Sequence, residues 1–397
     1  VRMNHNLLHE KIALTLSFLI LNNLLFLSLS FPPLLIKINF LIFLITILVF
    51  YFKNIFENSF LKISFLFIIF ISLGTPAYEW DARSIYLFHA KRIFYDNSIF
   101  SIADGYASFS HNEYPTLVPA FASSFAILIG HWNEVFPKLS FTLMFFPPLI
   151  LALSFMKNTK YLIFLSIVFF IISKYLFNGW TDGLVAIYFC LSSFLVYFIF
   201  IDENNPYRNK LLFYLLTYCF FVTLTLIKNE GSVLLVILFI TTFFLRLRQK
   251  KVNKNFLKIL LLLLLSFVPI LLWKIFCYTK GISHEFIHAS FFQNLLARSN
   301  DFDNYKQIFY FLILNEKFLL SLIFFSVSFW INKNWQIFNF VAIISLIYLF
   351  VLFLIYLSTP YDFYFQLDST AARVIKTLSF FIACFGLLNL NIIGKKF

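Results

Sequence analysis

Residues 76–119, PAYEWDARSIYLFHAKRIFYDNSIFSIADGYASFSHNEYPTLVP, form a polar interval far longer than the short breaks between most apolar runs of this chain. Only 12% of all residues are charged. This interval nevertheless gathers many acids, bases and histidines: Glu79, Asp81, Arg83, His89, Lys91, Arg92, Asp96, Asp104, His111 and Glu113. A water-facing segment with this content predicts recognition or chemistry.

The rest of the chain is apolar enough to form a membrane scaffold. Of its 397 residues, 61% are hydrophobic, above the roughly 45–50% that is typical of soluble domains. Apolar runs of about twenty residues recur, each long enough to cross a hydrocarbon core of ~30 Å as a helix. A membrane β-barrel would instead show alternating strands of about ten residues. We therefore predict an all-α polytopic membrane protein.

The basic residues indicate the topology. Residues 246–258, RLRQKKVNKNFLK, hold Lys and Arg but no acid between two apolar runs, which is typical of a cytoplasmic loop. The net charge of +13 therefore does not indicate a nucleic-acid partner. Lys395 and Lys396 place the C-terminus in the cytoplasm, and the helix count places the N-terminus there too. The interval 76–113 is then extracytoplasmic. The four cysteines stand singly in apolar runs, without metal-binding spacing.

Counting from both ends predicts about twelve spanning helices and a single membrane domain. We expect 12–31 to be a retained helix, because no small-residue cleavage site follows it. The short run 114–129 contains two prolines and is expected to re-enter the membrane or lie along its outer interface. The expected spans are 12–31, 34–52, 63–75, 138–156, 161–176, 183–201, 211–227, 232–247, 259–277, 307–331, 337–357 and 375–393. The domain, 1–397, comprises N-terminal helices 12–75, the loop 76–137 and the remaining helices 138–393.

Further charged residues fall on the same outer face. They are Asp182 in NGWTDGLVAIY, Lys228 and Glu230 in IKNEGS, and Asp362, Asp368 and Arg373 in TPYDFYFQLDSTAARVI, before the last expected helix. Ionisable groups at helix ends of a membrane protein are costly and indicate function. Solvated positions or interface anchors are favoured for Lys91, Arg92, Asp96, Asp104, Lys174 and Lys280. Asp81, beside the amphipathic Trp80 and Tyr78, lies where an apolar wall meets water and is a candidate general base toward a hydroxyl.

These motifs, taken in order, resemble the GT-C superfamily of membrane glycosyltransferases, in its bacterial ArnT/protein mannosyltransferase-like group. EWDARSIYLFHAK followed by HNEYPTLVP is similar to their first external loop, and NGWTDGLVAIY to their second acidic motif. TLIKNEG and TPYDFYFQLDSTAARV resemble later segments, so the likeness runs from about residue 76 to 375. It implies transfer of a sugar from a polyprenyl-phosphate carrier to a hydroxyl of a cell-envelope glycan or lipid, outside the bacterial inner membrane.

The resemblance implies a role for each matching residue. Asp81 matches the acid that deprotonates the acceptor hydroxyl, so that the sugar carbon is displaced with inversion. Asp182 matches an acid that orients the acceptor, assists the base or binds metal in some branches. Lys228 and Arg373 are expected to bind the departing lipid phosphate. Arg83 and His111 are second-rank candidates for binding the phosphate. The candidates for binding the substrate are His111, Glu113, Tyr114 and Glu230, although an ion pair of Glu230 with Lys228 is an equally favoured role. Asp368 is expected to orient Arg373.

The chain also departs from the family. Because 76–113 holds no DxD pair, we expect no required cofactor and no metal dependence. We also expect no large soluble domain after the last helix, and this expectation favours a glycan, a lipid-linked saccharide or a lipid A-like acceptor over an extended peptide. A partner flippase or lipid-sugar synthase would supply the donor.

Two other classes stay open. A transporter or flippase of lipid-linked sugars would place charges near the bilayer midplane on two related repeats, whereas these charges gather at one face. An O-antigen-type polymerase or ligase would use arginines and a histidine of a late loop. The segment 278–306 holds His284, His288 and Arg298.

Overall fold

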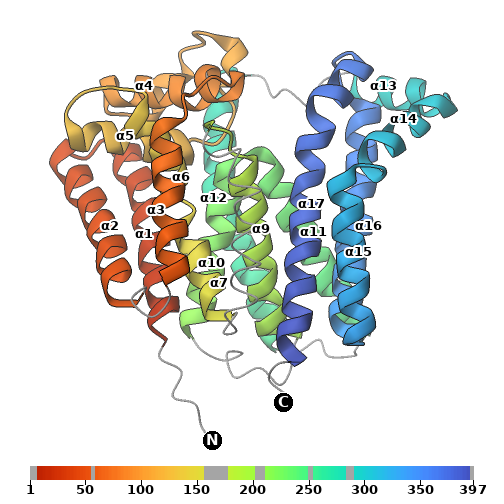
Figure 1. Cartoon of the computed structure of the whole chain (residues 1–397). Helices are drawn as coiled ribbons and strands as arrows, with labels where there is room; N and C mark the ends of the chain where they lie inside the picture. The colour runs from red at the N-terminus through yellow and green to blue at the C-terminus, as the bar shows by residue number, and fades with distance from the viewer. Residues whose placement is uncertain are drawn as a thin grey trace, which may run out of the picture.

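The computed structural model describes residues 7–54, 59–155, 178–201, 211–248, 254–282 and 290–393. All regular elements within these ranges are helices, and they form a bundle (Figure 1). Eight of the described helices are long and apolar enough to cross a membrane, or nine if one bent pair counts as a single span. The chain is therefore a polytopic α-helical membrane protein. The count of twelve stays a prediction, because the expected span 161–176 lies outside the described residues.

The N-terminal helices form close to their expected positions. They are α1 (Leu8–Ser28), α2 (Pro33–Asn54) and α3 (Ser59–Gly74). Pro33 begins α2, which suits its fixed φ and its missing N–H. Helices α1 and α2 both pack against α5 (Leu117–Ile129). The rings of Phe40 and Phe43 each lie 5.0 Å from the ring of Phe121, so aromatic packing joins α2 to α5.

The polar interval folds across one end of the bundle as short helical pieces (Figure 1). These are η2 (Ala82–Tyr86), α4 (Leu87–Asp96), η3 (Ile99–Ala103) and η4 (Ser108–Ser110). Helix α5 follows and has 13 residues, which gives a length of about 20 Å. It is too short to span, as expected for 114–129. Its residues up to Ile127 are buried, packed against α4, α2 and α6 (Val135–Leu143).

Helix α9 (Asp182–Val196) forms the centre of the bundle, since all of its residues are buried. The other central elements are α7 (Phe146–Phe155), η5 (Tyr197–Ile201), α10 (Leu211–Ile227), α11 (Asn229–Arg248) and α12 (Lys254–Thr279). Helix α9 packs against α7, α10 and α11, and also against the last described helix, α17 (Phe363–Ile393). Because α9 begins with Asp182, this packing brings a carboxylate to the junction of several helices.

The C-terminal part differs from expectation in two places. It comprises α13 (Phe291–Ser299), α14 (Phe302–Ile313), α15 (Glu316–Ile331), α16 (Trp335–Ser358) and α17 (Phe363–Ile393). The single span expected over 307–331 is divided into α14 and α15, which meet at 62°, because Asn315 caps α15 through Lys317 N. Helix α17 begins at Phe363 rather than 375, since Asp362 Oδ1 accepts from Phe365 N at 2.8 Å.

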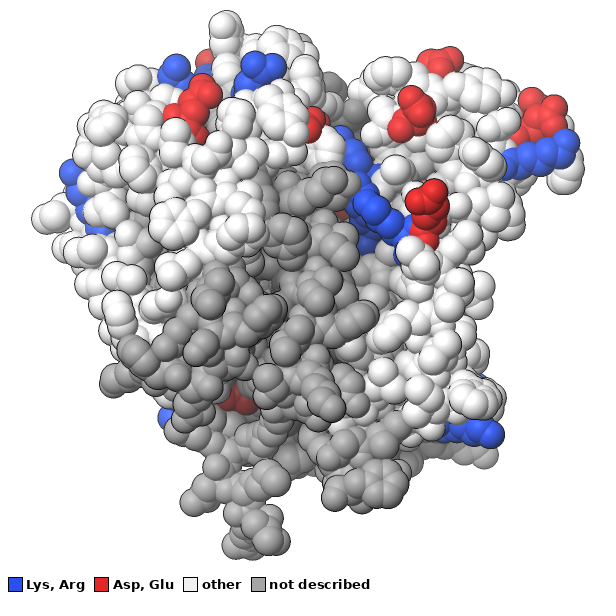
Figure 2. Space-filling view, in the orientation of Figure 1, with Lys and Arg blue, Asp and Glu red and all other residues white. Residues whose placement is uncertain are grey.

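The two ends of the bundle differ in composition. The first residue of α1 and the last of α17 lie at one end, while α4, α5, α13 and α14 lie at the other (Figure 1). Figure 2 shows acidic and basic side chains gathered at the end that carries α4 and α13. Few charged side chains lie over the middle of the described surface on this face (Figure 2). This distribution suits a membrane protein with an apolar belt.

Candidate functional site

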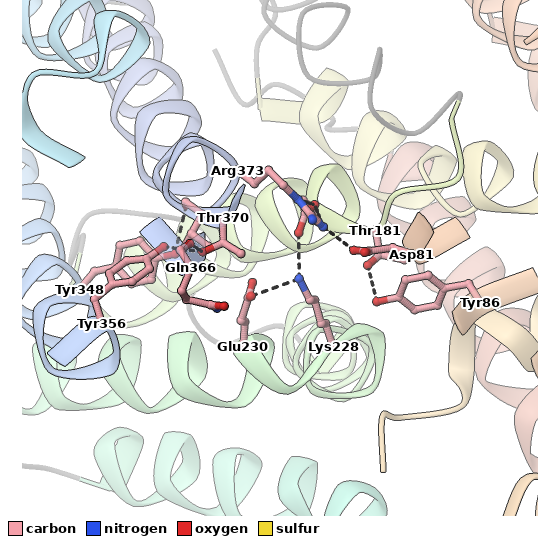
Figure 3. Close-up of polar contacts among 12 residues, drawn as sticks. Asp81, Tyr86, Thr181, Lys228, Glu230, Tyr348, Tyr356, Gln366, Thr370 and Arg373 are labelled. Carbon is pink, nitrogen blue, oxygen red and sulfur yellow. Dashed lines mark hydrogen bonds and ion pairs between the residues drawn. The ribbon is translucent and has the colours of Figure 1, made fainter. Parts of the chain in front are cut away.

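Side chains from four separate segments of the chain converge in one polar cluster (Figure 3). Asp81 directly precedes η2, and Asp182 is the first residue of α9. Lys228 lies between α10 and α11, and Arg373 lies within α17. Hydrogen bonds and ion pairs connect all four. These are the four residues that the sequence ranks first.

Arg373 bridges the two acids. Its Nε and Nη2 donate to Asp182 Oδ2 at 3.0 and 2.9 Å, and Nη2 also donates to Asp81 Oδ2. The guanidinium lies over the ring of Trp180, 4.5 Å from the ring centre. Planar guanidinium groups favour both kinds of contact. The two carboxylates therefore share one cation, although they lie 101 positions apart in the chain (182 − 81).

Lys228 extends the cluster on the other side of Asp182. Its Nζ donates to Asp182 Oδ1 at 2.9 Å and pairs with Glu230 Oε1 at 3.1 Å. Burial lowers the pKa of Lys228, but the carboxylates of Asp182 and Glu230 outweigh this effect and hold it well above its usual value. Lys228 is thus a cation at neutral pH. The site contains three carboxylates and two cations, and Glu230 forms the ion pair that was one of its two expected roles.

Hydroxyl groups form the walls of the cluster. Thr181 Oγ1 donates to Tyr86 Oη at 2.7 Å, and burial raises the pKa of Tyr86 so that it stays neutral. Tyr348 and Tyr356 lie on the opposite side, beyond Glu230 (Figure 3). Tyr356 Oη shares a hydrogen bond of 2.9 Å with Thr370 Oγ1. Buried neutral hydroxyls can donate or accept toward a polar ligand.

Two glycines allow the segments to approach one another. Gly179 has φ +87°, and a Cβ there would lie 2.6 Å from Ala82 Cβ, so only glycine lets this loop lie against η2. A Cβ at Gly231 would lie 1.9 Å from the carbonyl oxygen of Leu224. The tight junction of α10 and α11, which presents Lys228, therefore requires glycine at 231.

A second polar group lies in the turn 110–114. The side chains of His111 and Glu113 approach to 3.8 Å between Nδ1 and Oε1. The ring of His111 stacks on Tyr114 at 4.9 Å, and Trp80 contacts it edge-on at 5.8 Å. Trp80, whose ring contacts His111, directly precedes Asp81 in the chain. The turn is therefore connected to the ion-pair cluster through Trp80.

Several other candidates take no part in the cluster. Arg83 is exposed, and the described structure gives it no contact with the phosphate-binding candidates. Asp368 is also exposed, and no ion pair joins it to Arg373 among the described residues. The expectation that Asp368 orients Arg373 is wrong, because Asp81 and Asp182 do so. Asp368 and Arg373 lie inside α17 rather than before the last helix.

The late loop of the alternative interpretation is only partly described. His284 and His288 lie outside the described residues. Arg298 donates to the carbonyl oxygens of Thr359 and Tyr361 at 2.7 and 2.9 Å. It therefore fastens α13 to the turn between α16 and α17.

The arrangement combines an anion-binding element with an acid–base element. Arg373 Nη1 makes no hydrogen bond within the described part of the chain, and Lys228 Nζ has one donor beyond its two acidic partners. Both cations can therefore bind an incoming anion without releasing the acids. No group of three His, Cys, Asp or Glu side chains among the described residues is placed to hold a metal ion.

Some contributors were not recognisable in the sequence. Tyr348 and Tyr356 border the cluster but stand in an apolar run of a chain with 20 tyrosines, so nothing distinguished them. Trp180 and Thr181 adjoin Asp182 within the quoted motif, which was the available signal. No protein family, curated protein or solved structure matches the chain.

Proposed function

We propose that the protein is a membrane glycosyltransferase of GT-C type. It transfers a sugar from a polyprenyl-phosphate carrier to a hydroxyl of a cell-envelope glycan or lipid, on the extracytoplasmic face. The observation that carries the proposal is the bridging of Asp81 and Asp182 by Arg373, next to Lys228. A base and an anion-binding pair of cations adjoin each other there, as displacement of a phosphate by a hydroxyl requires.

In the proposed reaction Asp81 accepts the proton of the acceptor hydroxyl through Oδ1. No hydrogen bond engages that oxygen among the described residues, whereas Oδ2 accepts from Arg373. The acceptor oxygen forms a bond to the anomeric carbon while the bond from that carbon to the phosphate oxygen breaks. The electron pair leaves with the lipid phosphate, and attack from the opposite side inverts the configuration.

The cations stabilise the negative charge that develops on the phosphate. Arg373 presents Nη1, and Lys228 presents its third N–H. Asp182 contacts both cations and holds them in place, so its proposed role is positional. Because the cluster is mostly shielded from water, with side-chain exposures of 10–19% for Asp81, Asp182, Lys228 and Arg373, its charges act more strongly than on an open surface.

The test compares cell-surface glycans of wild type, deletion and Asp81→Asn cells by mass spectrometry at equal membrane levels of protein. Asp81→Asn removes the base and keeps the shape of the side chain. We expect it to lack the same single sugar unit as the deletion. Asp96→Asn, at an exposed acid outside the cluster, should retain that unit. Wild-type glycans from Asp81→Asn cells would refute the proposal, and accumulation of inward-facing lipid-linked sugar would instead indicate a flippase.

A further inference from the structure

The turn 110–114 is held in one conformation by contacts from other elements. His89 Nε2 bonds to the carbonyl oxygen of Ser110 at 2.8 Å, from α4. Trp273 Nε1 and Lys274 Nζ, both from α12, donate to the carbonyl oxygen of Glu113 at 3.1 and 2.8 Å. All three contacts reach the backbone, so they fix where the side chains of the turn point.

His111 adopts an uncommon conformation within this turn. Its φ of 51° and ψ of 58° lie in the left-handed region, which residues other than glycine seldom occupy. Tyr114 N donates to the carbonyl oxygen of His111 at 2.9 Å and closes the turn. A non-glycine residue held in this region by surrounding contacts is often found at binding sites.

The carboxylate of Glu113 is buried without a hydrogen bond. Its side chain is 6% exposed, and Oε1 has no hydrogen-bond partner among the described residues. His111 Nδ1 lies 3.8 Å from Oε1, which is too far for a direct hydrogen bond. Buried polar atoms are almost always hydrogen-bonded. An unsatisfied carboxylate oxygen on a fixed turn therefore points to a donor supplied by a ligand.

Aromatic faces lie next to this carboxylate. Tyr114 stacks on His111, and Trp80, which is 51% exposed, contacts the edge of the same ring. Trp80 directly precedes Asp81 in the chain. A ligand that contacts this turn and Trp80 would thus lie next to the segment that carries the proposed base. Hydroxyl donors on a partly apolar ring match a carboxylate beside aromatic faces.

We propose that Glu113 selects the transferred sugar, by accepting hydrogen bonds from hydroxyl groups of the donor's sugar ring beside Tyr114 and Trp80. This inference rests on the proposed function and names the subsite where the sugar is recognised. His111 and the α12 contacts of Trp273 and Lys274 are positioning groups for this carboxylate.

Binding to the detergent-purified full-length protein tests the inference. The probes are farnesyl phosphate and its glucose, galactose and mannose esters, titrated by isothermal calorimetry. One ester should bind wild type more tightly than farnesyl phosphate does. Glu113→Gln should weaken the binding of that ester about 10- to 100-fold, which is the range for the loss of a hydrogen bond to a charged group. It should leave farnesyl phosphate binding unchanged. Glu134→Gln, at an exposed acid, is the matched control and should change neither.

A second comparison uses wild type itself and guards against misfolding of the variant. Esters of the preferred sugar that lack one hydroxyl should bind wild type about 10- to 100-fold more weakly at one position. Removing the same hydroxyl should weaken the binding of the ester to Glu113→Gln by less than about threefold. Equal losses in both proteins, or an unchanged ester affinity in Glu113→Gln, would overturn the subsite and leave the proposed transfer intact. Absence of any preferred ester, together with wild-type glycans from Asp81→Asn cells, would overturn both.

Discussion

Replacing Arg373 by glutamine should destabilise the protein by a predictable amount. The guanidinium donates to Asp182 at 3.0 and 2.9 Å and also to Asp81. Its removal leaves both carboxylates with one cation fewer, and breaking a buried ion pair from one side costs about 3–5 kcal/mol. Arg373 and Asp81 side chains are each 19% exposed, so water screens part of this cost. We expect a loss of about 3 kcal/mol in the free energy of unfolding.

A double-mutant cycle distinguishes the loss of this contact from a general loss of stability. Free energies of unfolding are measured by titrating the detergent-purified protein with sodium dodecyl sulfate. The proteins are wild type, Arg373→Gln, Asp182→Asn and the double variant. Because both single changes remove the same contact, the double variant should lose about 2 kcal/mol less than the sum of the singles. Lys306→Gln removes an exposed pair with Asp303 and a cation–π contact with the exposed ring of Phe302, so it should change stability by less than about 1 kcal/mol.

The result that refutes this reasoning is additivity. If the two single effects add within about 0.5 kcal/mol, Arg373 and Asp182 do not interact as described. A loss below about 1 kcal/mol for Arg373→Gln would also contradict it, because that is the size of an exposed surface pair.

Two further predictions concern the surroundings of the site. Burial lowers the pKa of His89 to about 4, so between pH 6.5 and 4 the unfolded chain binds more protons than the folded one. Stability should therefore fall by up to ~3 kcal/mol as the pH drops through this window. The titration above, repeated at several pH values, should show a shallower fall in His89→Gln; equal pH dependence in both would contradict the assignment. Gly231→Ala should cost at least about 2 kcal/mol, because its Cβ would meet the carbonyl of Leu224. Gly74→Ala, where a Cβ meets nothing within 4 Å, should cost much less, and equal losses would exclude a close approach at Gly231.

The main residues of the cluster could be predicted because a membrane protein exposes few places for charge. Asp182 and Lys228 each stand at the end of an apolar run, and Asp81 stands in the polar interval that follows one, so the alternation of spans assigned them to one face. The alternation of spans predicts on which side of the membrane each residue lies, but not which side chains contact one another. The pairing of Arg373 with both acids depends on the rotation of α17 against α9, which hydropathy does not encode.

The start of α17 and the break between α14 and α15 differ from expectation for another reason. The first part of α17 carries Asp368 and Arg373, and this polar content made residues before 375 look like a loop. The sequence signal for this helix start is Asp362, an acid two residues after Pro360 that caps the first turn. The division of α14 from α15 at Asn315 likewise follows from local capping, which counts of apolar residues overlook. Local hydrogen bonds decided both helix boundaries.

The charge balance of the cluster bears on the proposed reaction. Three carboxylates face two cations, so these five side chains carry one net formal negative charge, and a sugar–phosphate diester adds one more. After transfer the phosphate monoester carries one charge more than the diester did, while Asp81 has become neutral by gaining the acceptor's proton. The total charge of the occupied site is therefore unchanged by the reaction. The step moves negative charge from Asp81 toward Lys228 and Arg373, which are already oriented by Asp182. A site that is preorganised in this way stabilises the transition state without rearranging its own dipoles.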